Sequence, residues 1–575
     1  MKFRVLSSYL EKLEKTSSRN EITQILANLF KKADKDEIDK IVYLVSGQLA
    51  PNYQGLVFNI ADRLMLQIIS KSYGMNLDKV RALYKEKGDL GDLSESLAKG
   101  KGKNLSVLTV YERMLSVAND SGEGSQERKI SAMAELLSDL EPLSARFVAR
   151  IPVGKLRLGF SDMTILDALS VMMKGDKSAR HEIETAFNVT VDIGKITKRV
   201  KENGLTGLKK VLPEPGTPIR PSLAERLPSA EKILEKVGRK VYVEPKYDGF
   251  RAQVHIFKAK GEKKVVIFSR NLESTTHMFP DLVNAAKRIK VASAIFDGEA
   301  IGYDPKNGKF LSFQETVQRK RKHGVEEAVK KLPLKLFLFD ILYKNGKSLM
   351  ELPFSKRRKI LEETISKVDE VVEITKQDTV ESAVVIRDLI KKYLAEGLEG
   401  ALIKKIEAPY KAGARGYHWV KYKKTTEQGV ADTIDCLVMG AYKGRGRRAG
   451  FGTGAFLVGI LDPQGGGKFK TVSKIGTGLT DEQWREINKR TQKLATSLKS
   501  GQYEVDKNLN PDIWVRPSLV VEILADEITV SPIHSAGLAL RFPRLIRFRD
   551  EKNPEQVTSL GELEKLFQMQ KTLLK

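Results

Sequence analysis

The sequence predicts a multidomain protein in which an all-α region is followed by a mixed α and β region and then by a small β-barrel. Three observations predict this order. Apolar residues recur three and four positions apart up to about Val211, short β-rich stretches follow a proline-rich segment, and the last region combines short strands with glycine-rich turns. The length of 575 residues is enough for about three or four domains.

The first predicted domain, residues 1–212, is helical. Segments such as EITQILANLFKKA and TVYERMLSVAND place their apolar residues at the spacing of one helix face. The segment VLPEPGTPIRPSLAERLP ends this pattern, because proline fixes φ and lacks the N–H that helices and central strands need. We place the domain boundary at this segment, whose prolines are Pro213, Pro215, Pro218, Pro221 and Pro228.

The second and third predicted domains are residues 213–427 and 428–575. The second alternates β-rich stretches such as VYVEPKYDGFRAQVHIF and KLFLFDILY with helical stretches such as SKRRKILEETISKV, which predicts a mixed α and β domain. The third combines ADTIDCLVMGAYKG, GAFLVGILD and SLVVEILADEITV with a helix near LTDEQWREINKRTQKLATSL. Short strands with glycine-rich turns favour a small barrel.

The composition is that of a folded, basic protein. Apolar residues make up 41% of the chain and charged residues 30%, which excludes a wholly disordered protein. The 99 basic and 73 acidic residues give a net charge of +26, which favours a polyanionic partner such as nucleic acid. A lysine-rich, thermostable surface explains the same surplus, and composition alone does not separate the two interpretations.

Cysteine content and hydropathy predict a soluble, cytoplasmic protein without a membrane span. Cys436 is the only cysteine, so an intramolecular disulfide and a cysteine-based zinc site are excluded. No apolar run reaches the roughly 18 residues of a membrane span, and MKFRVLSSYLEKLEKT lacks the core of a signal peptide. The histidines are scattered without metal-ligand spacing, which predicts neither zinc nor a histidine base.

The most informative short segment runs from Glu244 to Arg251 and reads EPKYDGFR, with Lys246 between a β-rich stretch and a glycine turn. A lysine is a nucleophile only when its amine is neutral, which requires desolvation or a nearby cation. Taken alone, this motif favours an ordinary surface lysine of a hairpin turn over a nucleophile, because short motifs recur by chance.

Further motifs follow Lys246 in a fixed order, and each has a counterpart in one family. Together they resemble the motifs of ATP-dependent DNA ligases of the archaeal and eukaryotic type, which belong to the covalent nucleotidyltransferases. KGDLGDLSESL and RIPVGKLRLGF in the helical region also resemble that family. The ordered motifs are Lys246–Tyr247–Asp248–Gly249 with Arg251, Ser269–Arg270–Asn271, Phe296–Asp297–Gly298–Glu299, residues 338–342 (LFDIL), 399–404 (EGALIK), 419–423 (WVKYK), 541–544 (RFPR) and 549–552 (RDEK).

The resemblance implies an all-α DNA-binding domain, an α+β adenylation (nucleotidyltransferase) domain and an OB-fold β-barrel. It implies an enzyme that seals nicks with 5′-phosphate and 3′-hydroxyl ends in duplex DNA, in replication, repair and recombination. ATP would adenylate Lys246, the AMP would move to the DNA 5′-phosphate, and the 3′-hydroxyl would displace it. The expected state is a monomer, associated with the nucleoid in a prokaryote.

The resemblance also implies residue roles at the nucleotide. Phe339 would stack on adenine, and the alternative is that it is a core aromatic of an apolar strand. Lys421 and Lys423 are two apart on a predicted strand, so they share a face and could reach the phosphates, unless this is only a solvated face. The full set of nucleotide-binding candidates is Glu244, Lys246, Arg251, Arg270, Glu299, Phe339, Lys404, Arg415, Lys421 and Lys423.

Carboxylates of the motifs are candidates for a metal site. Glu299 and Glu399 are hard oxygen donors suited to Mg²⁺, with Mn²⁺ as an alternative, and Asp248 is a weaker candidate. The alternative reading is that both glutamates are ordinary salt-bridged acids.

The last motif predicts a basic cluster that orients the departing pyrophosphate. Its candidate residues are Arg541, Arg544, Arg549 and Lys552. Plain contact with the DNA backbone is the alternative reading. Backbone contact is also expected of Arg150, Lys155 and Arg157, and of the glycine- and arginine-rich residues 443–448.

Two other functions remain open from the sequence. One is an RNA ligase or a capping guanylyltransferase, although the long helical region argues against it. The other is a catalytically dead nucleic-acid-binding protein, although none of the motifs is lost. The stretch LAKGKGKNLSVLTVYERM contains no glutamine and no pair of phenylalanines, so the sequence does not predict binding to a sliding clamp.

Overall fold

The computed structural model describes the chain except for residues 157, 228, 322–323, 366–369, 424–432, 445–450 and 573–575. The described residues divide into two compact units. The first unit comprises residues 1–224, 248–376 and 405–419, and the second comprises residues 225–247, 377–404 and 420–575. The chain crosses between the units several times, and one of these crossings falls inside the K-Y-D-G motif, between Tyr247 and Asp248.

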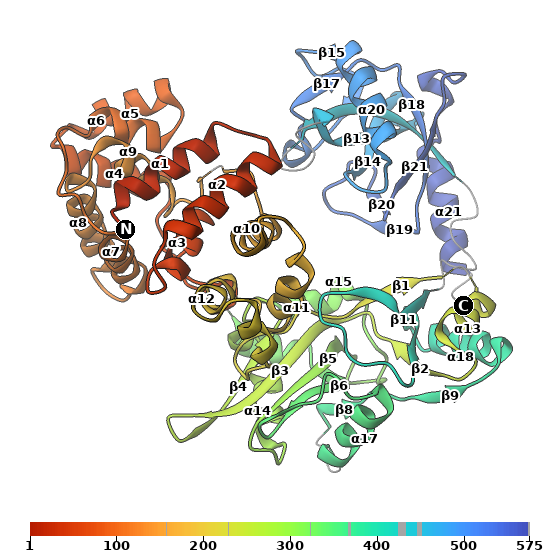
Figure 1. The fold of residues 1–575 in the computed structure, drawn as a ribbon. Helices are drawn as coiled ribbons and strands as arrows, with labels where there is room; N and C mark the ends of the chain where they lie inside the picture. Colours follow the sequence, from red (N-terminus) through yellow and green to blue (C-terminus); the bar gives the residue numbers. More distant parts are fainter. Residues whose placement is uncertain are drawn as a thin grey trace. The chain divides into compact units, whose positions relative to one another are not determined.

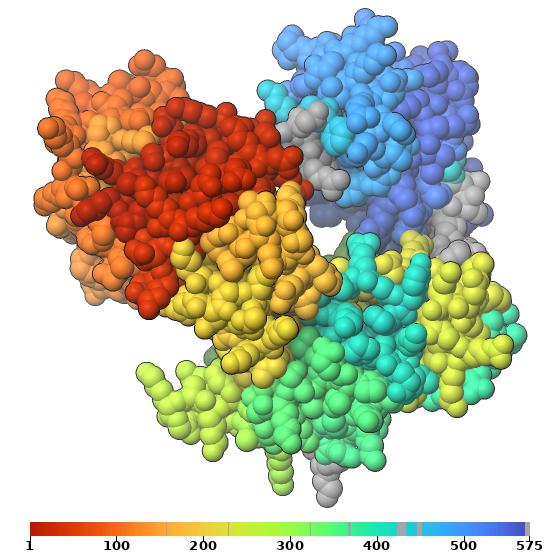
Figure 2. Space-filling model, in the orientation of Figure 1, coloured from red at the N-terminus to blue at the C-terminus, as the bar shows by residue number. Residues whose placement is uncertain are grey.

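The predicted helical region is helical in the structure (Figure 1). Some of its helices begin at polar caps, as where the Ser106 hydroxyl accepts the Thr109 N–H at 3.0 Å. Figure 2 shows the red and orange residues of this region forming one continuous surface on the face in view. The helices are α1 (Phe3–Glu14), α2 (Arg19–Lys32), α3 (Ile38–Val45), η1 (Asn52–Gln54), α4 (Asp62–Tyr73), α5 (Leu77–Lys87), α6 (Leu90–Leu97), α7 (Val107–Asn119), α8 (Ser125–Ser138), α9 (Pro142–Arg150), α10 (Asp162–Lys174), α11 (Arg180–Thr190), α12 (Ile193–Asn203) and η2 (Leu205–Lys210).

A buried ion-pair network joins helices of this region. Arg150 is only 2% exposed and contacts Asp89 at 2.7 Å, with Glu14 and Asp92 both at 2.9 Å. The expectation that Arg150 contacts the DNA backbone is therefore wrong, because its guanidinium is enclosed by protein carboxylates. Lys155 lies 2.5 Å from Asp62 and remains 37% exposed. Arg157 is outside the described residues.

The first unit also contains a sheet with the strand order β4-β3-β5-β6-β7, and β8 pairs with β6. Helix α14 packs against β3, β4, β6 and β8, and α17 packs against β6. The elements of residues 248–376 are β3 (Phe250–Ala259), β4 (Glu262–Phe268), η3 (Thr276–Met278), α14 (Pro280–Arg288), β5 (Ala294–Gly302), α15 (Phe313–Thr316), η4 (Val317–Arg319), α16 (Val325–Lys331), β6 (Leu334–Lys344), β7 (Lys347–Ser348), α17 (Phe354–Thr364) and β8 (Val372–Ile374).

The proline-rich segment after the helical region is ordered by hydrogen bonds on both sides. The N–H of Arg220 donates to the carbonyl of Asn188 in α11 at 2.9 Å. The N–H of Ile219 donates to Gln253 Oε1 in β3 at 2.8 Å. This segment is therefore docked between α11 and the sheet, and regular structure within it begins only after Pro221, at the edge strand β1 (Leu223–Arg226).

The second unit contains two larger sheets. One has the order β1-β11-β10-β2-β9 and carries α13 and α18, and the unit boundary crosses its strands β1 and β11. Helices α13 and α18 contact each other, and α18 contacts β2. These elements are β1 (Leu223–Arg226), α13 (Ala230–Val237), β2 (Val241–Lys246), β9 (Asp378–Val380), α18 (Ala383–Ala395), β10 (Gly400–Lys405) and β11 (Arg415–Lys423).

The C-terminal sheet follows the order β15-β17-β12-β13-β14-β16, and β18 pairs with both β12 and β21. Its apolar faces enclose a core that includes Val438, Val458 and Trp484. The elements are β12 (Ile434–Lys443), β13 (Thr453–Asp462), β14 (Lys468–Ile475), α20 (Asp481–Lys493), β15 (Ala495–Thr496), β16 (Tyr503–Glu504), η6 (Lys507–Leu509), β17 (Ile513–Val515), β18 (Val520–Leu524), β19 (Glu527–Val530), β20 (Leu538–Arg541), β21 (Arg544–Phe548), η7 (Pro554–Gln556) and α21 (Leu560–Thr572).

The three predicted regions thus have the predicted contents: helices, mixed α and β structure, and strands. Within the described part of the chain, no helix has the length and apolar character required to cross a membrane.

Candidate active site

Lys246 is the last residue of β2, and its ammonium group contacts the carboxylate of Glu399. The Glu399 N–H also donates to the Lys246 carbonyl at 3.0 Å, immediately before β10 begins. The two side chains are 26% and 24% exposed, so a solute can reach both. The second unit therefore brings together the predicted nucleophile and one predicted metal ligand.

Two more predicted nucleotide ligands of the second unit bind each other. Lys404 Nζ lies 2.7 Å from Glu244 Oε2, with side-chain exposures of 0% and 1%. The second oxygen of Glu244 accepts a hydrogen bond from Gln377 at 2.9 Å. A buried charge of this kind is stable only when it is paired and hydrogen-bonded. Base or phosphate contacts by Glu244 and Lys404 stay predictions.

In the first unit, strand β3 separates an apolar face from a polar one. Ala252, Val254 and Ile256 belong to the apolar core. The alternating residues point to the opposite face, where Arg251 lies opposite Glu299 of β5 in the strand register. The predicted ribose and metal ligands are therefore neighbours on one face of this sheet.

Gly249 is required by a close approach of two backbones. A Cβ atom at this position would lie 2.1 Å from the carbonyl oxygen of Ala300 in β5. Only glycine leaves room for this contact. The glycine of the K-Y-D-G motif thus has a structural reason, independent of any ligand.

Asp297 belongs to a predicted motif, but no role was predicted for it from the sequence. Its carboxylate contacts the Arg251 guanidinium and accepts hydrogen bonds from Gln253 at 3.0 Å and Tyr410 at 2.7 Å. Burial alone would raise the pKa of Asp297, but Arg251, Tyr410 and Gln253 together hold that pKa below its usual range. Its position in an otherwise apolar strand, two residues before Glu299, was the available signal.

Arg251 has one guanidinium nitrogen without a hydrogen-bond partner among the described residues. Its Nη2 contacts Asp297, whereas its Nη1 is buried without a hydrogen-bond partner among the described residues. Buried guanidinium nitrogens normally have partners. The arrangement suits a ligand oxygen arriving at Nη1.

Phe339 lies in a chain of edge-to-face aromatic contacts. Its ring is 5.9 Å from that of Trp419 at an interplanar angle of 81°, and Trp419 is 5.7 Å from Tyr410 at 82°. Phe339 is half-buried, whereas Trp419 and Tyr410 are buried. A half-buried ring held by buried ones can stack on a ligand without moving.

The remaining nucleotide candidates lie at ends of elements or on β11. Arg270 and Arg415 are exposed, at the turn after β4 and at the first residue of β11. Lys421 is half-buried on β11. The side chain of Lys423 lies outside the described residues.

The carboxylates predicted for Mg²⁺ suit that ion by their chemistry. Glu299, Glu399 and Asp248 are each partly exposed, so their oxygens are within reach of a hydrated cation. Asp248 uses Oδ2 to accept the Phe313 N–H at 3.1 Å, where α15 begins. No group of three or more acids, histidines or cysteines forms a ready-made metal cage in the described residues. Mg²⁺ needs few carboxylates when phosphates and waters complete its shell.

The predicted basic cluster of the last motif is paired with acids of the second unit. Arg549 and Lys552 both contact Asp435, at 3.1 and 2.6 Å. Arg544 contacts Asp526 at 2.5 Å. Arg541 lies 3.7 Å from Glu527. These ion pairs hold the cluster in place, and their acid Asp435 lies outside the predicted motifs.

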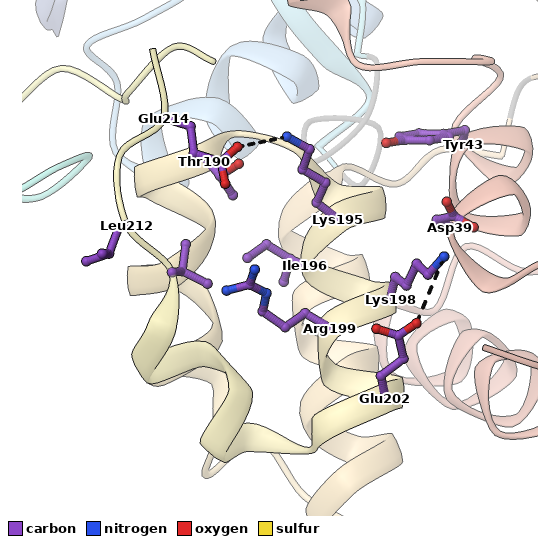
Figure 3. Close-up of a pocket in the computed structure, with 11 residues that line it drawn as sticks. Asp39, Tyr43, Thr190, Lys195, Ile196, Lys198, Arg199, Glu202, Leu212 and Glu214 are labelled. Carbon is purple, nitrogen blue, oxygen red and sulfur yellow. Dashed lines mark hydrogen bonds and ion pairs between the residues drawn. The ribbon is translucent and has the colours of Figure 1, made fainter. Parts of the chain in front are cut away.

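A separate cavity of about 300 Å³ lies in the helical region (Figure 3). Lys195 of α12 pairs with Glu214 across it at 3.2 Å. Lys198 and Glu202 lie on the same helix, with Asp39 and Tyr43 of α3 opposite. None of the predicted site residues lines this cavity.

The sequence matches three family models in the order of its regions. These are the DNA ligase N terminus over residues 2–170, the ATP dependent DNA ligase domain over residues 221–423 and the ATP dependent DNA ligase C terminal region over residues 448–552. The solved structure Pmar-Lig_PreS3 covers 95% of this chain and 99% of its own, with a TM-score of 0.55. At 18% identity, that likeness concerns the fold alone.

Similar proteins match along almost the whole chain. A probable DNA ligase of Dictyoglomus turgidum is 44% identical over 99% of this chain and 98% of its own length. DNA ligase 2 of Thermofilum pendens is 40% identical, and a DNA ligase of Saccharolobus shibatae is 38% identical, with the same coverage. Together with the ordered family matches and the lysine–glutamate pair at the end of β2, this end-to-end similarity shows that the chain belongs to the ATP-dependent DNA ligases, the enzymes that use ATP to seal nicks in DNA.

Proposed function

We propose that this chain seals nicks with 5′-phosphate and 3′-hydroxyl ends through a covalent Lys246–AMP intermediate. The contact between Lys246 and Glu399 carries the proposal, because it places a reachable amine at a defined strand end. Lys246 Nζ would lose a proton and bond to the α-phosphorus of ATP, while the bond from that phosphorus to the pyrophosphate oxygen breaks.

Glu399 would orient the Lys246 amine before this step. A carboxylate favours the charged amine, so the proton must leave as the nucleotide is bound. Glu399, Glu299 and Asp248 would hold Mg²⁺. The ion, when bound, would neutralise charge on the phosphates.

The first unit would supply adenosine contacts. The Arg251 Nη1 would donate to ribose or α-phosphate oxygens. The Glu299 carboxylate, on the same sheet face, would accept a hydrogen bond from a ribose hydroxyl. Phe339 would stack on adenine. Arg270 and Arg415 would add cations, and Lys404, Lys421 and Lys423 would contribute to phosphate binding.

The basic residues of the last motif would act in the first step, the adenylation of Lys246 by ATP. Arg541, Arg544, Arg549 and Lys552 would stabilise the negative charge on the departing pyrophosphate. The C-terminal sheet would be an OB-fold, an architecture suited to binding a nucleic-acid strand. Residues 1–212, 213–427 and 428–575 would form the DNA-binding, adenylation and OB-fold domains.

The experiment is intact mass spectrometry after incubation with ATP and Mg²⁺. We expect one AMP on the protein, its loss on adding nicked DNA, and appearance of sealed product. A folded protein that never carries AMP would overturn the proposal. Faster sealing of RNA ends than of nicked DNA would favour an RNA ligase instead.

A further inference from the structure

Tyr410 occupies the centre of a buried network that touches two predicted nucleotide ligands. It is 1% exposed and lies between the motifs that begin at Glu399 and end at Lys423. Its hydroxyl donates to Asp297 Oδ2 at 2.7 Å and accepts the Ser222 N–H at 3.1 Å. The hydroxyl is therefore fully used and has one orientation.

The hydroxyl of Tyr410 is connected to Arg251 through the carboxylate of Asp297. Asp297 divides its oxygens between them, since Oδ1 contacts Arg251 and Gln253 while Oδ2 accepts the Tyr410 hydroxyl. Loss of the hydroxyl would leave Oδ2 without this donor at a fully buried site. The carboxylate and the guanidinium would then be able to turn together.

The ring of Tyr410 is connected to Phe339 through the ring of Trp419. The Tyr410 ring meets the edge of Trp419, which in turn meets Phe339. The guanidinium of Arg357 also packs against the Tyr410 ring, 5.9 Å from the ring centre. Arg357 is itself fixed by two hydrogen bonds to Asp340, at 2.8 and 2.9 Å. The Tyr410 ring is therefore packed against both Trp419 and Arg357.

We propose that Tyr410 is a positioning residue that fixes Arg251 through its hydroxyl and Asp297, and fixes Phe339 through its ring and Trp419. This inference rests on the nucleotide roles proposed above for Arg251 and Phe339. One side chain thus aligns the group for the ribose or phosphate with the group for the base. The two routes use different atoms, so they can be separated by substitution.

Tyr410→Phe tests the hydroxyl route. It keeps the ring contacts and removes the donor to Asp297. In self-adenylation by the full chain, we expect KM for ATP to rise roughly tenfold and kcat to change by less than about twofold, because only nucleotide binding is loosened. In an Arg251→Lys background, Tyr410→Phe should raise KM for ATP by no more than about a further twofold, because its effect passes through Arg251.

Tyr43→Phe is the matched control. Tyr43 is a buried tyrosine of the same unit whose hydroxyl donates to the buried Asp192 at 2.6 Å. It should lower the melting temperature similarly and leave KM for ATP unchanged. An equal rise in KM for Tyr43→Phe would overturn the inference, as would a full tenfold effect of Tyr410→Phe added to Arg251→Lys.

Trp419→Phe tests the ring route and serves if Tyr410→Phe does not fold. It should raise KM for ATP in the wild-type background and add little in a Phe339→Leu background. A full additional effect there would refute the ring route. The proposed function is judged separately, by AMP attachment to the wild-type chain. If the wild-type chain is adenylated while Tyr410→Phe leaves KM unchanged, only the role of Tyr410 fails.

Discussion

Lys404 Nζ lies 2.7 Å from Glu244 Oε2, and both side chains are almost completely buried. Lys404→Met should lower the free energy of unfolding by about 3–5 kcal/mol, because it leaves the Glu244 charge buried without its cation. The double variant Glu244→Gln with Lys404→Met should recover much of this loss, as measured by chemical denaturation. If the double variant is stable but poorly adenylated, the pair also serves the nucleotide. Normal adenylation would limit it to a structural role.

Lys246→Ala should abolish self-adenylation, because the bond to AMP needs its amine nitrogen. Binding to nicked duplex should persist, since it depends on the basic surface. Lys240→Ala is the control, because Lys240 pairs with Glu381 at 3.0 Å just before β2 and should be dispensable. Mass spectrometry of both variants decides, and AMP on Lys246→Ala would contradict the assignment.

Replacing both Arg549 and Lys552 by alanine should reduce sealing from ATP sharply, by roughly 100-fold if both act on developing charge. Sealing of a pre-adenylated nick should fall much less, because that substrate bypasses pyrophosphate release. The control is Lys470→Ala, which removes another lysine–aspartate contact of the same region, at 2.9 Å from Asp462. Equal losses on both substrates would identify the cluster as a DNA-backbone contact.

Affinity for nicked duplex should fall steeply with salt, as bound cations displace counterions from the DNA. Lys443→Ala removes an exposed lysine at the end of β12 and should reduce the slope of log Kd against log salt by about one. Arg150→Leu should instead destabilise the helical region by about 3–5 kcal/mol, because the buried Asp89 carboxylate loses the Arg150 guanidinium, whereas Glu14 and Asp92 keep Arg146. A changed salt slope in a folded Arg150→Leu protein would show that Arg150 does reach DNA.

Acid should destabilise the sheet of the first unit through His255. Burial lowers the pKa of His255 from 6.5 to about 3, while Nδ1 accepts the Gly216 N–H. The unfolded chain therefore binds a proton between about pH 6.5 and 3 that the folded chain refuses, so stability falls as pH drops through this window.

The expected loss from this residue between pH 7 and pH 5 is about 2 kcal/mol. His255→Gln removes the titration and should flatten that part of the pH dependence. The control His181→Gln, at an exposed position of α11, should leave the pH dependence of stability unchanged. Calorimetric melting at the two pH values gives the comparison, and identical pH dependence in wild type and His255→Gln would refute the assignment.

Several features of this protein were determined by the sequence alone. Helical spacing before Val211, prolines between Pro213 and Pro228 and alternating strands afterwards are local patterns, so they predicted the order of the three regions. The family followed from motifs whose order along the chain is itself sequence information, and the relatives confirm it. Lys246 could be predicted as the nucleophile from the sequence, because the residues of its motif are consecutive in the chain.

The tertiary structure decided which charges face one another. The sequence predicts DNA contact for both Arg150 and Lys443. In the folded chain, however, Arg150 is enclosed by Glu14, Asp89 and Asp92. Asp297 and Tyr410 are 113 residues apart in the chain, and no local sequence pattern predicts the hydrogen bond between them. Periodicity records which side of a strand or helix a residue occupies, whereas ion pairs and buried hydrogen bonds depend on distances between segments that only packing sets.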